Sequence, residues 1–151
     1  MPERPRLLHG RPAIVLLAED NENDIELTRI GFEQSGFAVD LHVVRDGEAC
    51  VQFLRKQDAY ANADTPDLVL LDLQMPKMNG MEVLKALSSE DALRHIPVIV
   101  LTTSSSEREV TEAYRQHCRG YLIKPIGFGE FVRAVRALGE YWFNLVALPK
   151  G

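Results

Sequence analysis

The stretch Asp67-Leu-Val-Leu-Leu-Asp72 decides the fold, because it places an acidic side chain at the end of a short, unbroken apolar run. Such a run is typical of a strand that is buried on both faces of a parallel sheet. Pro76 and the pair Asn79-Gly80 follow it and indicate a loop before the next helix. We therefore expect Asp72 at the carboxyl end of a central strand.

Two further apolar runs lead into charged residues. Residues 13–18 are followed directly by Glu19 and Asp20, and residues 120–124 end in Lys124. In open α/β proteins the carboxyl ends of the strands meet at one edge of the sheet, where ligands bind. If these runs are neighbouring strands, all four charged groups meet at that edge, and the sequence predicts a reaction site there.

The remaining sequence alternates short apolar runs with stretches of helical period, which is the signature of repeated βα units around a parallel sheet. Strands are expected at residues 13–18, 38–44, 68–72, 97–102 and 120–124. Helices are expected at residues 23–35, after a cap at Asp46, at 81–88, after a cap at Ser106, and at 128–147. The first helix would start with the capping-box pattern Asn23-x-x-Glu26 and end at Gly36. The pattern predicts an α/β fold of five βα units.

Composition narrows the class of protein. The chain has 151 residues, of which 46% are hydrophobic, and this suits a single domain. Its formal net charge of -5 gives no basic surface for binding nucleic acid. Cys50 and Cys118 lack redox or metal spacing, and no segment is long and apolar enough to span a membrane. We expect a cytoplasmic protein that binds neither nucleic acid nor membrane, with residues 1–11 as a flexible arm.

The clustered carboxylates suggest phosphoryl chemistry. Carboxylates at adjacent strand ends raise one another's pKa unless a cation lies between them, and an all-oxygen cluster suits Mg²⁺. Phosphoryl transfer needs mainly positioning and charge neutralisation, which a metal ion, Lys124 and the hydroxyl of Thr102 can supply. Asp72 is then the natural nucleophile, because a carboxylate can take up a phosphoryl group as an acyl phosphate.

Together these motifs match a family. Glu19-Asp20, the segment Asp72–Gly80, Thr102 after an apolar strand, and Lys124-Pro125 resemble the receiver domain of two-component response regulators over about residues 12–140. The resemblance implies a doubly wound (βα)5, flavodoxin-like fold with strand order 2-1-3-4-5. Residues 12–151 would form this domain, including an extended last helix.

The resemblance also implies a metal site and a partner. Asp20 and Asp72 would bind Mg²⁺ directly together with the backbone carbonyl of Gln74, and Glu19 would act through a metal-bound water. A partner histidine kinase would donate its phosphoryl group to Asp72. The chain would then be a phosphoacceptor signalling protein that assists its own phosphorylation and dephosphorylation, and not an enzyme in the usual sense.

Further roles follow from the same resemblance. Thr102 and Lys124 would hold the phosphoryl oxygens, and Tyr121 would be the switch aromatic that turns inward as Thr102 moves. The peptide Lys124-Pro125 matches one that is frequently cis in the family. The acidic run 19–24 and the extended tail further resemble the small stand-alone regulators that serve bacterial and cyanobacterial phytochrome kinases.

Three alternatives are weighed against this interpretation. A haloacid-dehalogenase-like phosphatase expects an acid two residues after the nucleophile, where this chain has Gln74. A flavodoxin-type carrier of FMN needs a phosphate-cradling loop after the first strand, where residues 19–22 are acidic. A degenerate receiver that acts as a phosphorylation-independent scaffold would lack part of the constellation, and this chain retains it all. The scaffold remains the main alternative.

The last helix carries a second expectation. Apolar residues recur at a spacing near 3.5 and widen into a broad surface, which favours a homodimer through this helix. The candidate interface residues are Val135, Leu138, Trp142 and Leu145. The alternative is that the helix folds over the core of its own chain.

Overall fold

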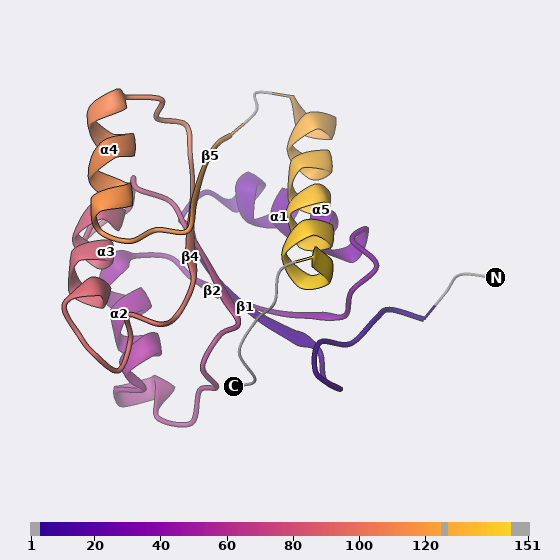
Figure 1. Ribbon diagram of the computed structural model, residues 1–151, viewed down its shortest axis with the longest axis horizontal. Coiled ribbons are helices and arrows are strands. Elements are labelled where there is room, and N and C mark those ends of the chain that lie inside the picture. Colours follow the sequence, from indigo (N-terminus) through magenta and orange to yellow (C-terminus); the bar gives the residue numbers. More distant parts are fainter. Residues whose placement is uncertain (1–3, 125–126, 146–151) are drawn as a thin grey trace.

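The computed structural model describes residues 4–124 and 127–145, and its centre is a parallel sheet (Figure 1). The strands are β1 (Ala13–Ala18), β2 (Val39–Val44), β3 (Leu68–Leu71), β4 (Val98–Thr102) and β5 (Gly120–Ile123). They lie side by side in the order β2-β1-β3-β4-β5, and all pairs are parallel. The predicted doubly wound, flavodoxin-like topology is confirmed.

Helices cover both faces of the sheet. They are α1 (Glu22–Glu33), α2 (Gly47–Arg55), α3 (Gly80–Ser88), α4 (Glu107–Arg115) and α5 (Phe128–Leu145), with a short 3-10 helix η1 (Asp58–Tyr60) after α2. Figure 1 shows α1 and α5 on one side of the sheet and α2, α3 and α4 on the other. Within the described residues, no helix is long and apolar enough to cross a membrane.

Side-chain caps define where most helices begin. The predicted caps Asp46 and Ser106 accept hydrogen bonds from the backbone N–H groups of Ala49 and Glu109, over 2.7 Å and 3.4 Å. The cap of α1 differs from the prediction, because Asn21 and not Asn23 accepts from the backbone of Asp24, over 3.0 Å. The acidic run after β1 therefore turns into a helix two residues earlier than its capping-box pattern indicated.

The apolar face of the last helix packs against the core of its own chain, which corrects the predicted dimer interface. Val135, Leu138 and Trp142 are all buried, and they pack in one core cluster with residues of α1 and the sheet. The apolar surface of α5 is broad because it covers the sheet and α1 together. Since these three side chains are buried within one chain, they cannot form an exposed interface in this fold; the side chain of Leu145 lies outside the described residues.

The segment expected to be a flexible arm makes contacts with the rest of the domain. Within residues 4–11, Arg6 pairs in parallel with Phe37, and Leu8 is buried. Arg11 donates both of its terminal nitrogens to Asp67 over 2.8 Å each. Backbone pairing and a two-fold ion pair thus attach part of the segment to the domain, and its flexibility stays a prediction.

Candidate phosphoacceptor site

Asp72 follows β3 directly and lies at the edge where the strands end. The pairing of β1 with β3 sets Ala18 opposite Leu71, so that Glu19 and Asp72 leave the sheet side by side. The backbone N–H of Asp72 donates to the carbonyl of Ala18 over 3.0 Å, and the Asp72 residue is only 7% exposed. The register of two buried strands thus places the acidic pair.

Lys124 reaches the same edge from β5. Its backbone N–H donates to the carbonyl of Thr102 over 2.7 Å, which continues the β4–β5 pairing by one residue. Because β5 lies two strands from β3 and neighbouring strands are about 4.8 Å apart, a long side chain is needed to cross the gap. The Nζ atom of Lys124 donates to Asp72 Oδ2 over 3.0 Å and also pairs with Glu19.

A further carboxylate approaches Lys124 from α1. Asp24 Oδ2 accepts from Lys124 Nζ over 2.7 Å. Asp24 was not among the predicted site residues, although it ends the acidic run 19–24. Its position in the run could be read from the sequence, but the side on which α1 presents it could not.

Burial and charge act in opposite directions in this cluster. Burial raises the pKa of Glu19 to about 7, and the hydrogen bond from Lys124 opposes that rise. Burial by itself lowers the pKa of Lys124, but the hydrogen bonds to Asp24 and Glu19 outweigh it and hold the pKa above its ordinary value. Lys124 is therefore charged at neutral pH and suited to neutralise an anionic oxygen.

Three of the carboxylates fit a hard cation. Glu19, Asp20 and Asp72 each offer an oxygen, and these oxygens all lie within 4.8 Å of one another. Asp20 is exposed and the other two are buried, so the cluster is open on one side, as suits an ion such as Mg²⁺ that keeps several waters. The backbone N–H of Gln74 donates to Asp72 Oδ1 over 3.0 Å; the role of its carbonyl as a ligand stays a prediction.

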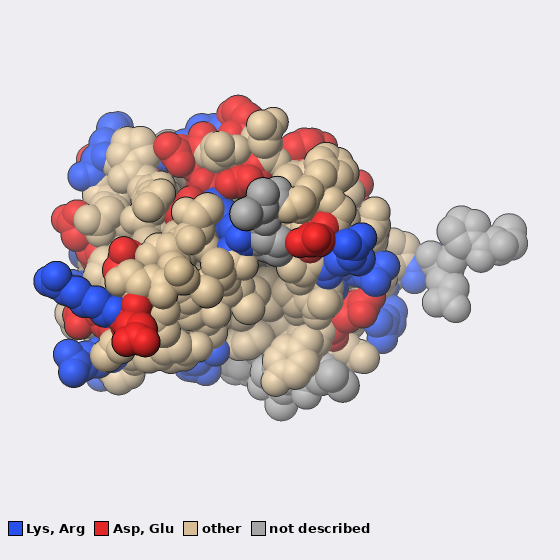
Figure 2. Space-filling model, turned by 90° about the horizontal axis from the view of Figure 1, so that it is seen from above, with Lys and Arg blue, Asp and Glu red and all other residues tan. Residues whose placement is uncertain are grey.

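Acidic side chains gather on one part of the surface. Figure 2 views the molecule from above Figure 1 and shows Asp and Glu side chains gathered toward the upper edge of that face, beside a basic side chain. A concentration of negative charge of this kind attracts a divalent cation.

The two predicted switch residues share a partner. Thr102 is fully buried, and its Oγ1 accepts from the backbone N–H of Ser104 over 3.5 Å. Tyr121 donates its hydroxyl to the carbonyl of the same Ser104 over 2.9 Å. The Ser104 side chain in turn donates to Glu109 of α4 over 3.1 Å. The loop after β4 therefore links Thr102, Tyr121 and α4; the predicted cis peptide at Lys124-Pro125 lies outside the described residues.

Residues 15–136 match the response regulator receiver domain family. The chain belongs to this family. Its fold, its acidic cluster and its strand-end lysine are those expected of a receiver, and receivers act in phosphorylation-based two-component signalling. The phosphatase and FMN-carrier alternatives are thereby set aside.

Several known proteins are similar to this chain over most of their length. FilR2, a probable methanogenesis regulatory protein of Methanothrix harundinacea, is 42% identical, over 88% of this chain and 85% of that protein. The Mn²⁺-bound structure of the response regulator Rcp1 of Synechocystis is 37% identical with a TM-score of 0.88, covering 92% of this chain and 100% of the other. The phosphorylated cyanobacterial phytochrome response regulator RcpA is 36% identical with a TM-score of 0.89, covering 92% and 99%.

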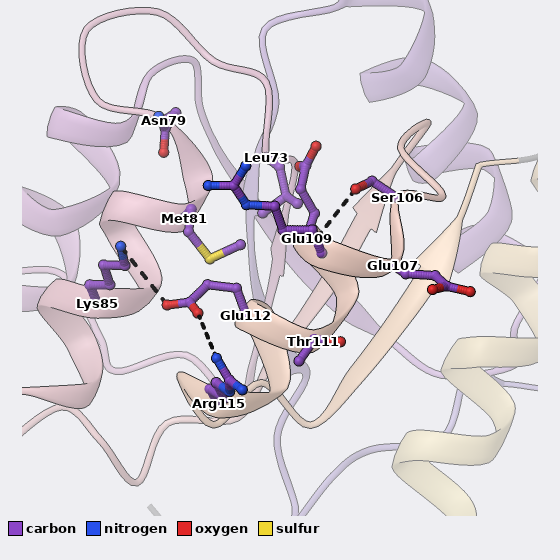
Figure 3. Close-up of a pocket in the computed structure, with 11 residues that line it drawn as sticks. Leu73, Asn79, Met81, Lys85, Ser106, Glu107, Glu109, Thr111, Glu112 and Arg115 are labelled. Carbon is purple, nitrogen blue, oxygen red and sulfur yellow. Dashed lines mark hydrogen bonds and ion pairs between the residues drawn. The ribbon is translucent and has the colours of Figure 1, made fainter.

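A polar groove of this receiver lies between α3 and α4 (Figure 3). Its volume is about 1110 Å³, and its walls carry charges of both signs. Lys85 of α3 faces Glu112 of α4 at 3.9 Å, and Arg115 lies 4.0 Å from the same carboxylate. The groove contains Leu73, which follows Asp72, and Glu109, which accepts from Ser104. It therefore adjoins the loops of the site but is not the place where the carboxylates meet.

One glycine brings the loop after β3 close to the site. A Cβ atom added at Gly80 would lie 2.4 Å from the backbone carbonyl oxygen of Asp72. No side chain fits in that space. The Asn79-Gly80 pair, which the sequence indicates as a loop, thus lets α3 start directly against the end of β3.

Proposed function

We propose that Asp72 accepts a phosphoryl group from the phosphohistidine of a partner histidine kinase. A carboxylate oxygen of Asp72 attacks the phosphorus, and the bond from phosphorus to the imidazole nitrogen breaks. The imidazole keeps the electron pair and takes up a proton. The observation that carries the proposal is the 3.0 Å contact between Lys124 Nζ and Asp72 Oδ2 within the carboxylate cluster, because a fixed ammonium neutralises charge on the phosphoryl oxygens.

Mg²⁺ is the metal that this reaction would use. Asp20 and Asp72 would bind it directly with the Gln74 carbonyl, and Glu19 would act through water; the close approach of the three carboxylates supports this assignment. When bound, the ion relieves the repulsion among the carboxylates and neutralises phosphoryl oxygens. The fold itself would hold Asp72 in place. Lys124 would bind one phosphoryl oxygen, and the hydroxyl of Thr102 would donate to another.

The loop after β4 would transmit the effect of phosphorylation from the site to the surface of the protein. If the Thr102 hydroxyl turns toward the phosphoryl group, it gives up the backbone N–H of Ser104. Tyr121 is bound to the carbonyl of that residue, so a displacement of Ser104 would also move the acceptor of the Tyr121 hydroxyl. A phosphoryl group that contacts only one of two loop arrangements favours that arrangement and alters the affinity for partners.

The kinase partner is proposed to be of the phytochrome type, in the cytoplasm. The support is the similarity to RcpA, which is a phytochrome response regulator and shares the fold over 92% of this chain. The carboxylate cluster could accept a phosphoryl group from any histidine kinase, so the proposal of a phytochrome kinase depends on the similarity to phytochrome response regulators.

The test is phosphorylation by acetyl phosphate, followed by intact mass. Wild type is expected to gain one phosphoryl group with Mg²⁺ and none after EDTA treatment, and Asp72→Asn is expected to gain none. The control Asp40→Asn removes an exposed carboxylate of β2 and should still gain the group. A folded wild-type protein that takes up no phosphoryl group under these conditions would favour the scaffold alternative.

A further inference from the structure

Asp24 contacts the site lysine but has no role in the chemistry described so far. Its carboxylate lies 2.7 Å from Lys124 Nζ, and its side chain is 24% exposed. Among the described residues, the carboxylates that approach one another closely enough to share a cation are Glu19, Asp20 and Asp72, and Asp24 is not one of them. Its contact with the ammonium therefore needs its own explanation.

The helix dipole does not explain this contact. Acidic residues in the first turn of a helix are favourable because they face the partial positive charge there, and α1 has two of them, Glu22 and Asp24. The Glu22 side chain is 75% exposed and pairs with Arg45 on the surface. Asp24 is directed toward Lys124, on a different strand. Two residues of the same turn therefore have different surroundings, and only one of them touches the site.

We propose that Asp24 is a positioning residue that fixes the direction of the Lys124 ammonium group toward Asp72. An ammonium group has three N–H donors, and Lys124 Nζ contacts three carboxylates, those of Glu19, Asp24 and Asp72. With two donors held by Glu19 and Asp24, the third is aimed at the carboxylate that reacts. The proposal rests on the proposed function of Asp72 as phosphoacceptor.

The geometry also indicates what changes when the phosphoryl group arrives. The donor that meets Asp72 Oδ2 can pass to a phosphoryl oxygen on the same side chain, while Glu19 and Asp24 keep the other two. The ammonium then needs no reorientation during the reaction, which is the arrangement that lowers a barrier through preorganisation. Without Asp24 one donor is released, and the group can rotate away.

The experiment compares the full-length variants Asp24→Ala, Asp24→Asn and Asp24→Glu with the control Glu22→Gln. The rate of adduct formation is measured by intact mass at saturating acetyl phosphate and Mg²⁺. Loss of one charge-assisted hydrogen bond should slow Asp24→Ala about tenfold. Asp24→Glu should recover most of that loss. Glu22→Gln removes a negative charge from the same helical turn but leaves the contacts of Lys124 intact, so its rate should match that of wild type.

A second measurement follows Lys124 itself in protein treated with EDTA. A small amine-modifying reagent is applied, and the labelling of each lysine is quantified by peptide mass spectrometry. Lys124 should be labelled several-fold faster in Asp24→Ala than in wild type or Glu22→Gln. Thermal unfolding of each variant shows whether it is folded, and Asp24→Asn, which keeps the shape and an acceptor, should show both effects in weaker form if Asp24→Ala is unstable.

The outcomes separate this inference from the proposed function. A wild type that is phosphorylated, with Asp24 variants that keep its rate and its Lys124 labelling, would overturn the positioning role. Weaker Mg²⁺ binding in calorimetry with unchanged Lys124 labelling would also overturn it, because Asp24 would then act on the metal. If wild type takes up no phosphoryl group, the proposed function fails, and the labelling still decides whether Asp24 restrains Lys124.

Discussion

At the level of single residues, burial determines the reactivity of the Cys50 thiol. It is fully buried in the core between the sheet and α2. Burial, together with the charge of Asp46, raises the pKa of its thiol from the ordinary value to about 12. Burial also raises the pKa of Cys118. Because the thiolate is the reactive form, both residues are expected to behave as small apolar side chains in the folded protein.

Both thiols are therefore expected to be protected at pH 8. Ellman's reagent, followed by absorbance, should react slowly with the native protein and rapidly in denaturant. The raised pKa also makes the free energy of unfolding depend on pH, because the folded state keeps the Cys50 proton to higher pH than the unfolded state does. The stability is therefore fully present below the ordinary thiol pKa and falls as the pH rises toward about 12. One thiol that reacts in the native protein as fast as a free cysteine would contradict the prediction.

At the scale of elements, the contact of α1 with α5 depends on a glycine. A Cβ atom added at Gly31 would lie 2.5 Å from Cβ of Val135 and 3.0 Å from the carbonyl oxygen of Val132. Both neighbours belong to α5, and the second is backbone, which cannot move aside as a flexible side chain can. The close approach of the two helices therefore requires the missing side chain at position 31.

Gly31→Ala is accordingly expected to destabilise the protein, although alanine favours helices. Overpacking of this kind costs about 1–3 kcal/mol of the free energy of unfolding, which urea denaturation would measure. Gly129→Ala in α5 is the matched control, because its new Cβ atom would meet only the Arg133 side chain, at 3.2 Å. The control should be neutral or slightly stabilised. Equal stability of Gly31→Ala and wild type would show that the helices can separate without cost.

At the scale of the whole molecule, distant parts of the chain meet at the end of α5. Phe143 packs against Phe32 of α1 and against Phe37, with ring centroids 6.3 Å and 5.5 Å apart. Arg6 lies over the Phe37 ring at 4.4 Å and donates to the Asn144 side chain over 3.2 Å. The start of the chain, the turn after α1 and the last helix are thereby joined, so α5 stabilises the domain as a whole.

Trp142→Ala tests whether α5 serves the core or an interface between chains. Loss of a buried tryptophan from a core costs about 3–5 kcal/mol, and this loss should be the same at low and high protein concentration. Tyr141→Ala removes an exposed neighbour, 56% exposed, and should have little effect. Urea denaturation at protein concentrations that differ roughly 50-fold would check both, since stability that depends on subunit association changes with concentration. A concentration-dependent loss in Trp142→Ala would restore the interface hypothesis.

Local sequence patterns specify most of the helices and strands and the presence of the acidic edge. Short, unbroken apolar runs such as 68–71 are typical of strands that are buried on both faces, and parallel strands bring their carboxyl ends to one edge. Asp72, Glu19 and Lys124 could therefore be expected to meet before any coordinates were known. Caps such as Asp46 could be predicted for a similar local reason, because the bond that makes them spans three residues.

What covers each surface depends on packing between elements and is seen only in the folded protein. The apolar stripe of α5 is visible in the sequence, but whether a second chain or the chain's own α1 covers it depends on how the two helices cross. For the same reason, the contact of Asp24 with Lys124 and the attachment of Arg6 beside Phe37 could not be predicted. Periodicity specifies which face of an element is apolar or charged, whereas the partner of that face is set by packing between segments far apart in the sequence.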